Sequence, residues 1–363
     1  MGTIDIVPKE KMSNLTVGKQ QMCEIAKAIS HKAEIIIFDE PSAALTEKEI
    51  ADLFVIIRDL REKNLGIVYI SHRMDEIKVI TDRVTVMRDG GYVGTLITKD
   101  STKEDIINMM VGRVIYEDPK EKNMTPPGAP VVLKVDHLNA GKMVQDVSFE
   151  LRKGEILGFG GLVGAQRTEL LEGVFGMRGI ASGEIYIKGN KVNIKHPSDA
   201  MKAGIGLITE DRRGNGIFGC LSIKDNVGVS IYNKHLKAGF VLDHKTINAI
   251  VDDSIKKLRI KTPNMQEHIA NLSGGNQQKV IVARWLANDP DILIMDEPTR
   301  GIDVGAKHEI YEIMNDLAAE GKAIIMISSE MAELLGMSDR VYVMCNGKMR
   351  GELTEAEEMT QEH

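Results

Sequence analysis

Residues 291–298 read DILIMDEP, and residues 34–41 read EIIIFDEP. In each stretch, four consecutive apolar residues are followed by two acids and a proline. A short continuous apolar run is typical of a parallel strand that is buried on both faces. Functional groups in α/β sheets gather at the carboxyl ends of such strands. The two stretches therefore predict two buried strands, each with a pair of acids at its end.

The similarity between the two stretches extends well beyond them. LTVGKQQMCEIAKAISHKAEIIIFDEPSAALT begins at Leu15 and LSGGNQQKVIVARWLANDPDILIMDEPTRGID begins at Leu272, an offset of 272 − 15 = 257 residues. The same offset relates Asp82 to Asp339. One register kept over so many positions identifies an internal repeat.

Apolar residues after the first pair of acids follow a helical period. Ile50, Leu53, Phe54 and Ile57 are spaced i, i+3, i+4 and i+7, and a further apolar strand pattern, LGIVYI, follows at residues 65–70. Helices that alternate with strands predict an α/β fold with a largely parallel sheet in each copy. The polar, periodic segment from about residue 222 to residue 271 is expected to be a helical insertion.

The stretch GGLVGAQRTE, residues 160–169, has the position of a phosphate-binding loop. It lies between an apolar strand pattern and a helical one, where a loop of the form G-x-x-x-x-G-K-[ST] would close its backbone amides on phosphate. The last three positions of that form here hold Gln166, Arg167 and Thr168. We therefore expect an altered phosphate loop.

The second copy is longer than the first at its amino end. Subtracting 257 from Gly161 gives −96, a position before the chain begins. We expect residues 1–113 to be the C-terminal half of a first nucleotide-binding domain, so that the sequence is truncated at its N-terminus. Residues 114–130, polar with several prolines, are expected to be a linker, and residues 131–363 a second nucleotide-binding domain.

Composition narrows the function classes. A chain of 363 residues that is 43% hydrophobic can form two ordinary domains. The net charge of −7 argues against nucleic acid as the main partner. Cys23, Cys220 and Cys345 are too widely spaced for a disulfide framework or a metal cluster. No apolar run approaches the roughly 20 residues that span a bilayer.

The acids at the strand ends suggest phosphoryl chemistry. Mg²⁺ prefers oxygen ligands, and a water molecule that attacks phosphate needs a carboxylate nearby. We expect Asp39 and Asp296 to hold Mg²⁺ through water. We expect Glu40 and Glu297 to polarise the attacking water.

The stretch LSGGNQ, residues 272–277, precedes a helical pattern. Amides at a helix N-terminus form an edge that binds anions. The stretch lies about twenty residues before its own acids, so we expect it to face a different nucleotide.

Together with DILIMDEPT, LSGGNQ resembles the signature of ABC-type ATPases, which have a P-loop NTPase fold. In that family, two domains enclose two ATP molecules head to tail. By this resemblance the nucleotide-binding residues of the chain are Gly161, Gly164, Gln166, Arg167, Thr168, Glu210, Leu272, Ser273, Gly274, Gly275 and Gln277. Glu210, in ITEDRR, occupies the position of a glutamine that contacts the metal and the transporter.

Within that superfamily the chain is similar to the tandem ATP-binding subunits of bacterial simple-sugar importers. The similarity lies in GLVGAQRTE, TEDRR, LSGGNQQKV, DEPTRGIDVGAK and SSEMAELLGMSDR. A long polar residue at position 166 favours the galactose/methyl galactoside branch, with ribose or xylose as alternatives. The resemblance implies ATP and Mg²⁺ as cofactors.

The same resemblance predicts two unequal sites. Asp39, Glu40 and His72 would belong to the hydrolytic site, opposite residues 272–277. The altered loop, with Asp296 and Glu297, would face residues 15–20 in a non-hydrolytic site, where Ser329 replaces the histidine because 72 + 257 = 329.

The expected partners are transmembrane permease subunits and a periplasmic or lipid-tethered sugar-binding protein, with no nucleic acid. The expected location is the cytoplasmic face of a bacterial membrane, where the chain would be peripheral. One alternative is a soluble twin-domain ATPase that acts on ribosomes or DNA. Another is an inactive fragment, because the first copy as given has no phosphate loop. Residues 1–363 alone are expected to show no significant ATP hydrolysis.

Overall fold

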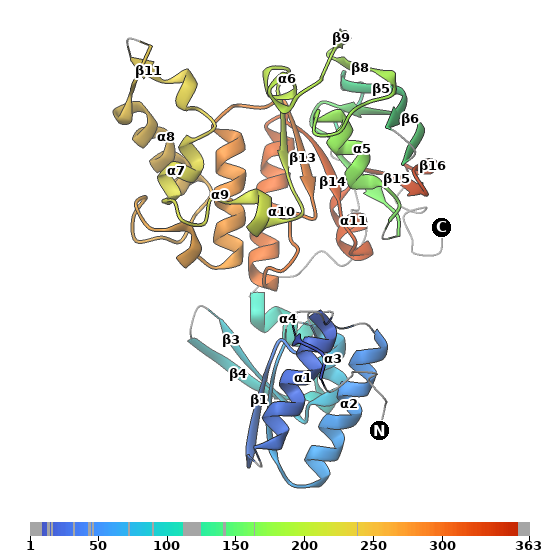
Figure 1. Ribbon diagram of the computed structural model, residues 1–363, viewed down its shortest axis with the longest axis vertical. Coiled ribbons are helices and arrows are strands. Elements are labelled where there is room, and N and C mark those ends of the chain that lie inside the picture. Colours follow the sequence, from blue (N-terminus) through green and yellow to red (C-terminus); the bar gives the residue numbers. More distant parts are fainter. Residues whose placement is uncertain are drawn as a thin grey trace. The chain divides into compact units, whose positions relative to one another are not determined.

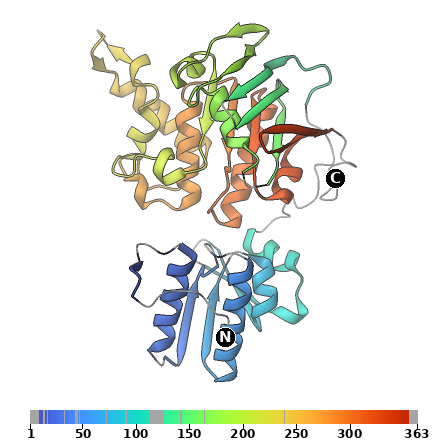
Figure 2. The ribbon, with the colours of Figure 1, turned by 45° about the vertical axis from the view of Figure 1, so that its right-hand side comes forward.

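The computed structural model describes residues 9–12, 15, 17–31, 33–42, 45, 47–71, 73–88, 91–111, 125–140, 143–162, 164–237 and 239–354. The chain divides into two compact units, Met1–Ile115 and Tyr116–His363, drawn in Figure 1 and, turned, in Figure 2. Most of the expected linker lies outside the described residues. No helix in the described ranges is long and apolar enough to cross a membrane.

The second unit is built on a six-stranded sheet with the order β10-β13-β14-β7-β15-β16. Its strands are β7 (Ile156–Gly160), β10 (Ile205–Ile208), β13 (Ile292–Asp296), β14 (Ala323–Ile327), β15 (Arg340–Cys345) and β16 (Lys348–Leu353). All pairs are parallel except β15 with β16. Every residue of β7, β10, β13 and β14 is buried, which confirms the prediction from the apolar run at residues 292–295.

Two hydrophobic layers cover the faces of this sheet. On one face, Ile292 and Ile294 pack in a cluster with the four-stranded antiparallel sheet β6-β5-β8-β9 and with α5. On the other face, Leu293 and Met295 pack with α7, α8, α9 and α10. Successive side chains of a strand point to opposite faces, so β13 contributes to both layers. Figure 1 shows the helical layer and the antiparallel strands on opposite sides of the unit.

These covering elements have the following bounds. The antiparallel strands are β5 (Val131–Ala140), β6 (Val144–Arg152), β8 (Ser182–Ile187) and β9 (Asn190–Val192). The helices are α5 (Arg167–Val174), α6 (Pro197–Lys202), α7 (Ile223–Gly228), α8 (His244–Lys257), α9 (Gly274–Leu286), α10 (Val304–Ala319) and α11 (Met331–Met337).

The segment at residues 222–271 is helical where the sequence predicts it, in α7 and α8. It also contains a small antiparallel hairpin, β11 (Leu236–Lys237) with β12 (Val241–Leu242), which the sequence did not predict. Strands of two residues are too short to show the alternation by which strands are recognised.

The first unit has a parallel pair of strands, β1 (Ile35–Asp39) and β2 (Gly66–Ile70). Its other elements are α1 (Val17–Ser30), α2 (Glu47–Glu62), α3 (Met74–Ile80), the antiparallel strands β3 (Arg83–Arg88) and β4 (Gly91–Ile97), and α4 (Lys103–Val111). Ile50, Leu53 and Ile57 of α2 are buried, as their helical spacing predicts.

The repeat predicted from the sequence is confirmed in the element bounds. Adding 257 to the first residues of α1, β1, α2, β2, α3 and β3 gives the first residues of α9, β13, α10, β14, α11 and β15. These elements therefore begin at equivalent positions in the two copies of the repeat.

Burial differs sharply between the copies on one face of the sheet. The exposed apolar residues of β1 and β2 are Ile35, Ile37, Val68 and Ile70. Their equivalents in the second unit are Ile292, Ile294, Ile325 and Ile327, all buried in the layer under the antiparallel sheet. In the first unit the buried residues of β1, Ile36 and Phe38, pack on α1 and α2. The described part of that unit therefore presents an apolar sheet face to solvent.

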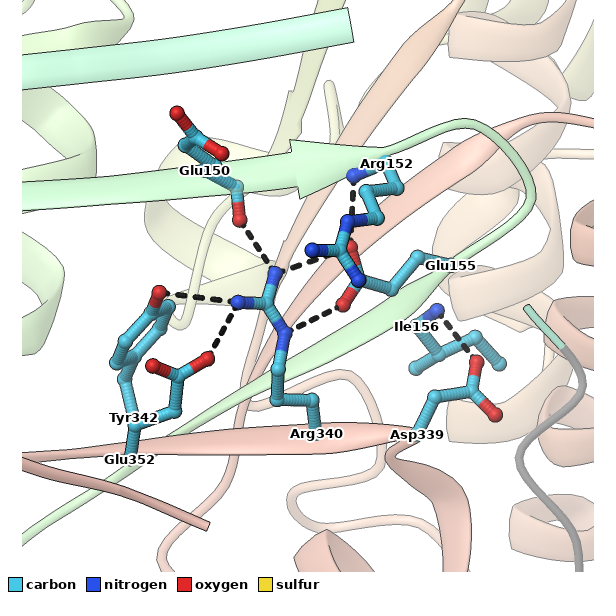
Figure 3. A network of polar contacts seen from close by, with 8 residues as sticks. All are labelled: Glu150, Arg152, Glu155, Ile156, Asp339, Arg340, Tyr342 and Glu352. Carbon is cyan, nitrogen blue, oxygen red and sulfur yellow. Dashed lines mark hydrogen bonds and ion pairs between the residues drawn. The ribbon is translucent and has the colours of Figure 1, made fainter. Parts of the chain in front are cut away.

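A buried charged network joins the starts of β7 and β15 in the second unit (Figure 3). Arg340 Nε donates to Glu155 Oε1 at 2.8 Å, and Nη1 donates to Glu352 Oε1 at 2.6 Å. Its other partners are the hydroxyl of Tyr342 at 3.0 Å and the carbonyl oxygen of Glu150 at 2.7 Å. Arg340 is 7% exposed and Glu155 2% exposed. One guanidinium therefore connects β6, β15 and β16 with Glu155, the residue that precedes β7.

The backbone around this network is held by carboxylates as well. Glu155 Oε2 accepts from the amide of Arg152 at 2.7 Å, and Asp339 Oδ2 accepts from the amide of Ile156 at 2.9 Å. Both contacts lie beside Arg340 in Figure 3. Buried amides need partners, so these carboxylates fix where β7 enters the sheet.

Arg340→Met is expected to lower the free energy of unfolding of the second unit by about 3–5 kcal/mol, because it leaves Glu155 buried without its cation. The double variant Arg340→Met/Glu155→Leu should recover most of this loss. Urea unfolding followed by the fluorescence of Trp285, the only tryptophan of the chain, measures both. A double variant as unstable as the single one would contradict the prediction.

The two copies allow a matched test of the exposed face. Ile294→Thr should cost about 2–4 kcal/mol in the second unit, since it removes buried apolar volume and buries a hydroxyl. Ile37→Thr, at the equivalent exposed position, should change the stability of the first unit by no more than about 0.5 kcal/mol. Hydrogen exchange of each unit under mild denaturant gives both values, and equal losses would refute the described difference in burial.

Candidate functional site

The loop before α5 has the backbone of a tight turn. Gly161 has φ 150° and Gly164 has φ 85°. A Cβ on Gly161 would lie 2.5 Å from the carbonyl oxygen of Met344, so close backbone approach requires glycine there. Gln166 is left-handed as well, with φ 75°, although it is not a glycine. Such strain in a non-glycine residue is typical of functional loops.

The side chain of Gln166 folds back onto its own loop. Its Nε2 donates to the carbonyl oxygen of Gly164 at 2.9 Å. Its Oε1 is buried without a hydrogen-bond partner among the described residues. The side-chain amide of Gln166 is therefore held against its own loop, at the position where the motif G-x-x-x-x-G-K-[ST] has a glycine without a side chain.

Arg167, the first residue of α5, is buried and points across the sheet. Its Nη1 donates to the carbonyl oxygen of Ser328, just after β14, at 2.8 Å. The loop therefore has its positive charge, but the guanidinium is bound to the end of the neighbouring strand. Ser328 was not predicted as a partner of Arg167 from the sequence.

Asp296 and Glu297 lie at the end of β13, beside this loop. Burial raises the pKa of Asp296 to about 6, against the lowering effects of a hydrogen bond from Thr168 and the charge of Arg167. Burial likewise raises the pKa of Glu297 to about 7, although Ser329 Oγ donates to its Oε2 at 3.1 Å. The structure thus brings together the predicted loop residues and both acids of the second copy.

This group has the chemistry that a magnesium ion needs. Asp296 Oδ1 is buried and has no hydrogen-bond partner in the described part of the chain, and the Thr168 hydroxyl is next to Asp296. Within the described ranges, no group of three or more His, Cys, Asp or Glu side chains could hold a metal. Mg²⁺ commonly binds through one or two protein oxygens together with phosphates and water. The residues present therefore fit magnesium bound with a phosphate ligand.

The acids of the first copy are held by the same backbone geometry. The amide of Glu40 donates to the carbonyl oxygen of Ile70 at 2.9 Å, and the amide of Glu297 donates to that of Ile327 at 2.9 Å. Glu40 and Glu297 are both left-handed, with φ 46° and 48°. Asp39 is exposed, whereas Asp296 is buried. His72 lies outside the described residues.

The predicted signature, residues 272–277, forms the beginning of α9. Ser273 is the N-cap residue, and Asn276 Nδ2 donates to its hydroxyl at 2.9 Å. A Cβ on Gly275 would lie 2.3 Å from that of Ala306, so packing on α10 requires glycine there. Gly274 lies next to it in the first turn.

Gln277 holds this loop together. It is buried, and its Nε2 donates to the carbonyl oxygens of Leu272 at 3.1 Å and Ile269 at 3.3 Å. In the first copy, the equivalent Gln20 donates to Leu15 and Met12, each at 3.0 Å. What the structure shows for Gln277 is a contact within the loop, and its contact with nucleotide stays a prediction.

Glu210 is paired within the second unit. Its carboxylate accepts from Arg300 Nη1. The two residues line a hollow of about 460 Å³, together with Asp211, Arg212 and Arg213. Arg300 could not be predicted as a partner of Glu210, because nothing in the local sequence pattern pairs residues that are 90 positions apart.

Comparison with known proteins gives a consistent result. A family model described as ABC transporter matches residues 144–300. The galactose/methyl galactoside import ATP-binding protein MglA of Clostridium tetani is 52% identical over 361 residues, which cover 99% of this chain and 71% of that protein. A putative ribose/galactose/methyl galactoside import ATP-binding protein of Geobacillus kaustophilus is 51% identical over 362 residues, with the same coverage.

Solved structures support the same fold. MJ1267, an ATP-binding cassette of an ABC transporter, matches with a TM-score of 0.55 and 21% identity, over 63% of this chain and 93% of that chain. The structure of cbiO1 from Clostridium perfringens matches with a TM-score of 0.55 and 22% identity, over 64% of this chain and 92% of that chain. The predicted α/β fold of P-loop ABC ATPases is therefore confirmed.

Glu297→Gln is expected to stabilise the second unit at pH 8 in metal-free buffer. The folded pKa of about 7 lies above the ordinary 4.5, so the folded state binds more protons and the parent loses stability as pH rises between these values. The variant cannot ionise there and should gain about 1–2 kcal/mol over the parent at pH 8, after allowance for partial exposure. At pH 4 the two should be equal. Unfolding by urea at both pH values measures this, and a gain that does not depend on pH would contradict it.

Proposed function

We propose, since this chain belongs to the ATP-binding proteins of ABC-type sugar import systems, that it binds ATP with Mg²⁺ and energises the import of a monosaccharide. Galactose or methyl galactoside is favoured over ribose or xylose. The identity of 52% to a galactose/methyl galactoside import ATP-binding protein supports this preference, as does the long polar side chain at Gln166.

One observation carries the proposal for the second unit. The N-terminus of α5, the Thr168 hydroxyl and the buried unpartnered oxygen of Asp296 lie at one end of the sheet. Helix N-terminal amides favour phosphate oxygens. A bound magnesium ion would supply positive charge to the phosphates of ATP, with Thr168 and Asp296 as its protein ligands.

The residues of the chain would have different roles in binding and hydrolysing ATP. Gly161 and Gly164 let the backbone approach the phosphates, and Arg167 adds a cation beside them. Glu40 and Glu297 both have a left-handed backbone at the end of their strands. Each carboxylate would accept a proton from water. We propose that Glu40, with His72 and Asp39, serves the hydrolytic site. Glu297, beside Ser329, serves a site that binds nucleotide and hydrolyses it poorly.

The organisation we propose is that of two nucleotide-binding domains, of which residues 1–113 are a part of the first and residues 131–363 form the second, joined by a linker at residues 114–130. The loop at residues 272–277 would contact a nucleotide held by another such domain. Glu210 would lie near the transporter. The proposed partners are permease subunits and a sugar-binding protein, and the proposed place is the cytoplasmic face of the membrane.

Thr168→Val tests nucleotide binding in the second unit. The variant keeps the shape of the side chain and removes the hydroxyl, so the dissociation constant for MgATP should rise about tenfold. The dissociation constant for ATP in EDTA should change less than about threefold, because no magnesium ion is then held. Isothermal titration calorimetry on the full chain measures both.

Thr168→Ser, which keeps the hydroxyl, is the matched control and should bind MgATP like the parent. Equal weakening with and without magnesium would sink the ligand assignment. A parent chain that binds no MgATP at millimolar concentration would overturn the proposal of a nucleotide site in this unit.

A further inference from the structure

A buried glutamate ties two loops of the candidate site together in the second unit. Glu333, in α11, is 5% exposed. Its Oε1 accepts from Thr299 Oγ1 at 2.5 Å, and its Oε2 accepts from Ser328 Oγ. Thr299 lies in the loop after the two acids, and Ser328 lies in the loop after β14. One carboxylate therefore joins the loops that leave two neighbouring strands.

The first unit contains the same arrangement. Glu76, in α3, is 3% exposed. Its Oε2 accepts from Ser42 Oγ at 2.7 Å and from Ser71 Oγ at 3.3 Å. The offset of 257 takes these residues to the three of the second unit, since 76 + 257 = 333, 42 + 257 = 299 and 71 + 257 = 328.

The surroundings of the two carboxylates differ. Glu76 also accepts from the Tyr69 hydroxyl at 2.8 Å and pairs with Arg73 Nη1 at 2.8 Å. The equivalent positions in the second unit hold Met326 and Glu330. Among these side-chain contacts, the two hydroxyls on the glutamate are common to both copies. Burying a carboxylate is costly, and an apolar residue of similar size is often no less stable. The shared part therefore calls for a reason other than stability.

The contacts of the loop after β14, which contains Ser328 and Ser329, suggest that reason. Ser329 follows Ser328, and its hydroxyl donates to Glu297 at 3.1 Å. The carbonyl oxygen of Ser328 accepts from Arg167 at 2.8 Å. The position of Ser328 thus sets where Ser329 meets Glu297 and where the guanidinium of the phosphate loop is held.

We propose that Glu333 and Glu76 are positioning residues. Each holds the loop after a pair of acids against the loop after the next strand. Glu333 thereby sets the separation of Glu297 and Ser329, and Glu76 does the same for the loops that contain Ser42 and Ser71. This role rests on the proposed nucleotide function, because it concerns the geometry of that site.

Thr299→Val tests the positioning role of Glu333 in the second unit, since it removes one of the two hydroxyls that donate to Glu333 and keeps nearly the same side-chain shape. The reporter lies on the other loop: the amide of Glu330 donates to Ser328 Oγ at 3.0 Å. In the full chain without nucleotide, hydrogen exchange of peptides covering residues 327–334 should become at least about tenfold faster, although the substitution is at position 299. Peptides from α8 and β10 should change less than about twofold.

The matched control is Thr299→Ser, which keeps the hydroxyl and should restore the exchange of the parent. Glu333→Gln should speed exchange in both loops. In calorimetry, Thr299→Val should also weaken MgATP binding about threefold, because Arg167 loses its fixed carbonyl. Ser42→Ala with Ser42→Thr as control repeats the exchange test in the first unit, with peptides that cover α3.

The outcomes separate the two proposals. If hydrogen exchange of residues 327–334 is the same in Thr299→Val and Thr299→Ser, the positioning role is overturned. The same holds if exchange in α8 and β10 rises as much as exchange in residues 327–334. If the parent binds no MgATP but Thr299→Val still speeds hydrogen exchange of residues 327–334, the positioning role of Glu333 is supported and the proposed nucleotide function is overturned. If the parent binds MgATP, and Thr299→Val binds it with the same affinity as Thr299→Ser, the contacts of Glu333 do not serve the nucleotide site.

Discussion

The burial of β13 on both faces is the constraint from which the rest of the second unit follows. The strand lies between β10 and β14 and pairs with both, and its side chains pack in two separate hydrophobic layers. Polar residues can appear only where the strand leaves the sheet, which is at Asp296 and Glu297. There the chain turns sharply, with Glu297 left-handed and its amide bound to Ile327. The place of the acids is thus a consequence of the core.

The first unit shows what part of this depends on the strand itself. EIIIFD forms a strand that pairs in parallel with the next one, and Glu40 makes the same left-handed turn and the same backbone hydrogen bond as Glu297. Burial is not reproduced, because the described part of the first unit has α1 and α2 on one face and no counterpart of the antiparallel sheet on the other. Asp39 is therefore exposed where Asp296 is buried. Local sequence dictates the turn, whereas the electrostatics of the acid depend on neighbouring elements.

The same distinction explains what could be predicted from the sequence. Apolar runs, helical periodicity and the offset of 257 predicted the strands and the helices, since these depend on short-range pattern or on sheet topology. The meeting of Thr168 with Asp296 was implied by the resemblance to ABC-type ATPases. The fold-back of Gln166 and the reach of Arg167 to Ser328 could not be predicted, because they depend on side-chain rotamers within a packed site. The tie at Glu333 left a trace in the sequence: its partners recur at the same offset, but hydroxyl residues in loops are too common to stand out.

The residues that differ between the copies indicate how the two sites are specialised. An imidazole can donate to phosphate and can carry a positive charge near neutral pH, which a serine hydroxyl cannot. Position 72 has the imidazole and position 329 has the hydroxyl, whose contact in the structure is with Glu297. Because Ser329 already donates to Oε2 of Glu297, that oxygen is less available to a water molecule than a free carboxylate oxygen would be. The second unit keeps the contacts of Glu333 that position the loop after β14, whereas the residue at position 329 of that loop is serine instead of histidine. We infer that the change acts on hydrolysis and leaves the geometry for holding a nucleotide intact.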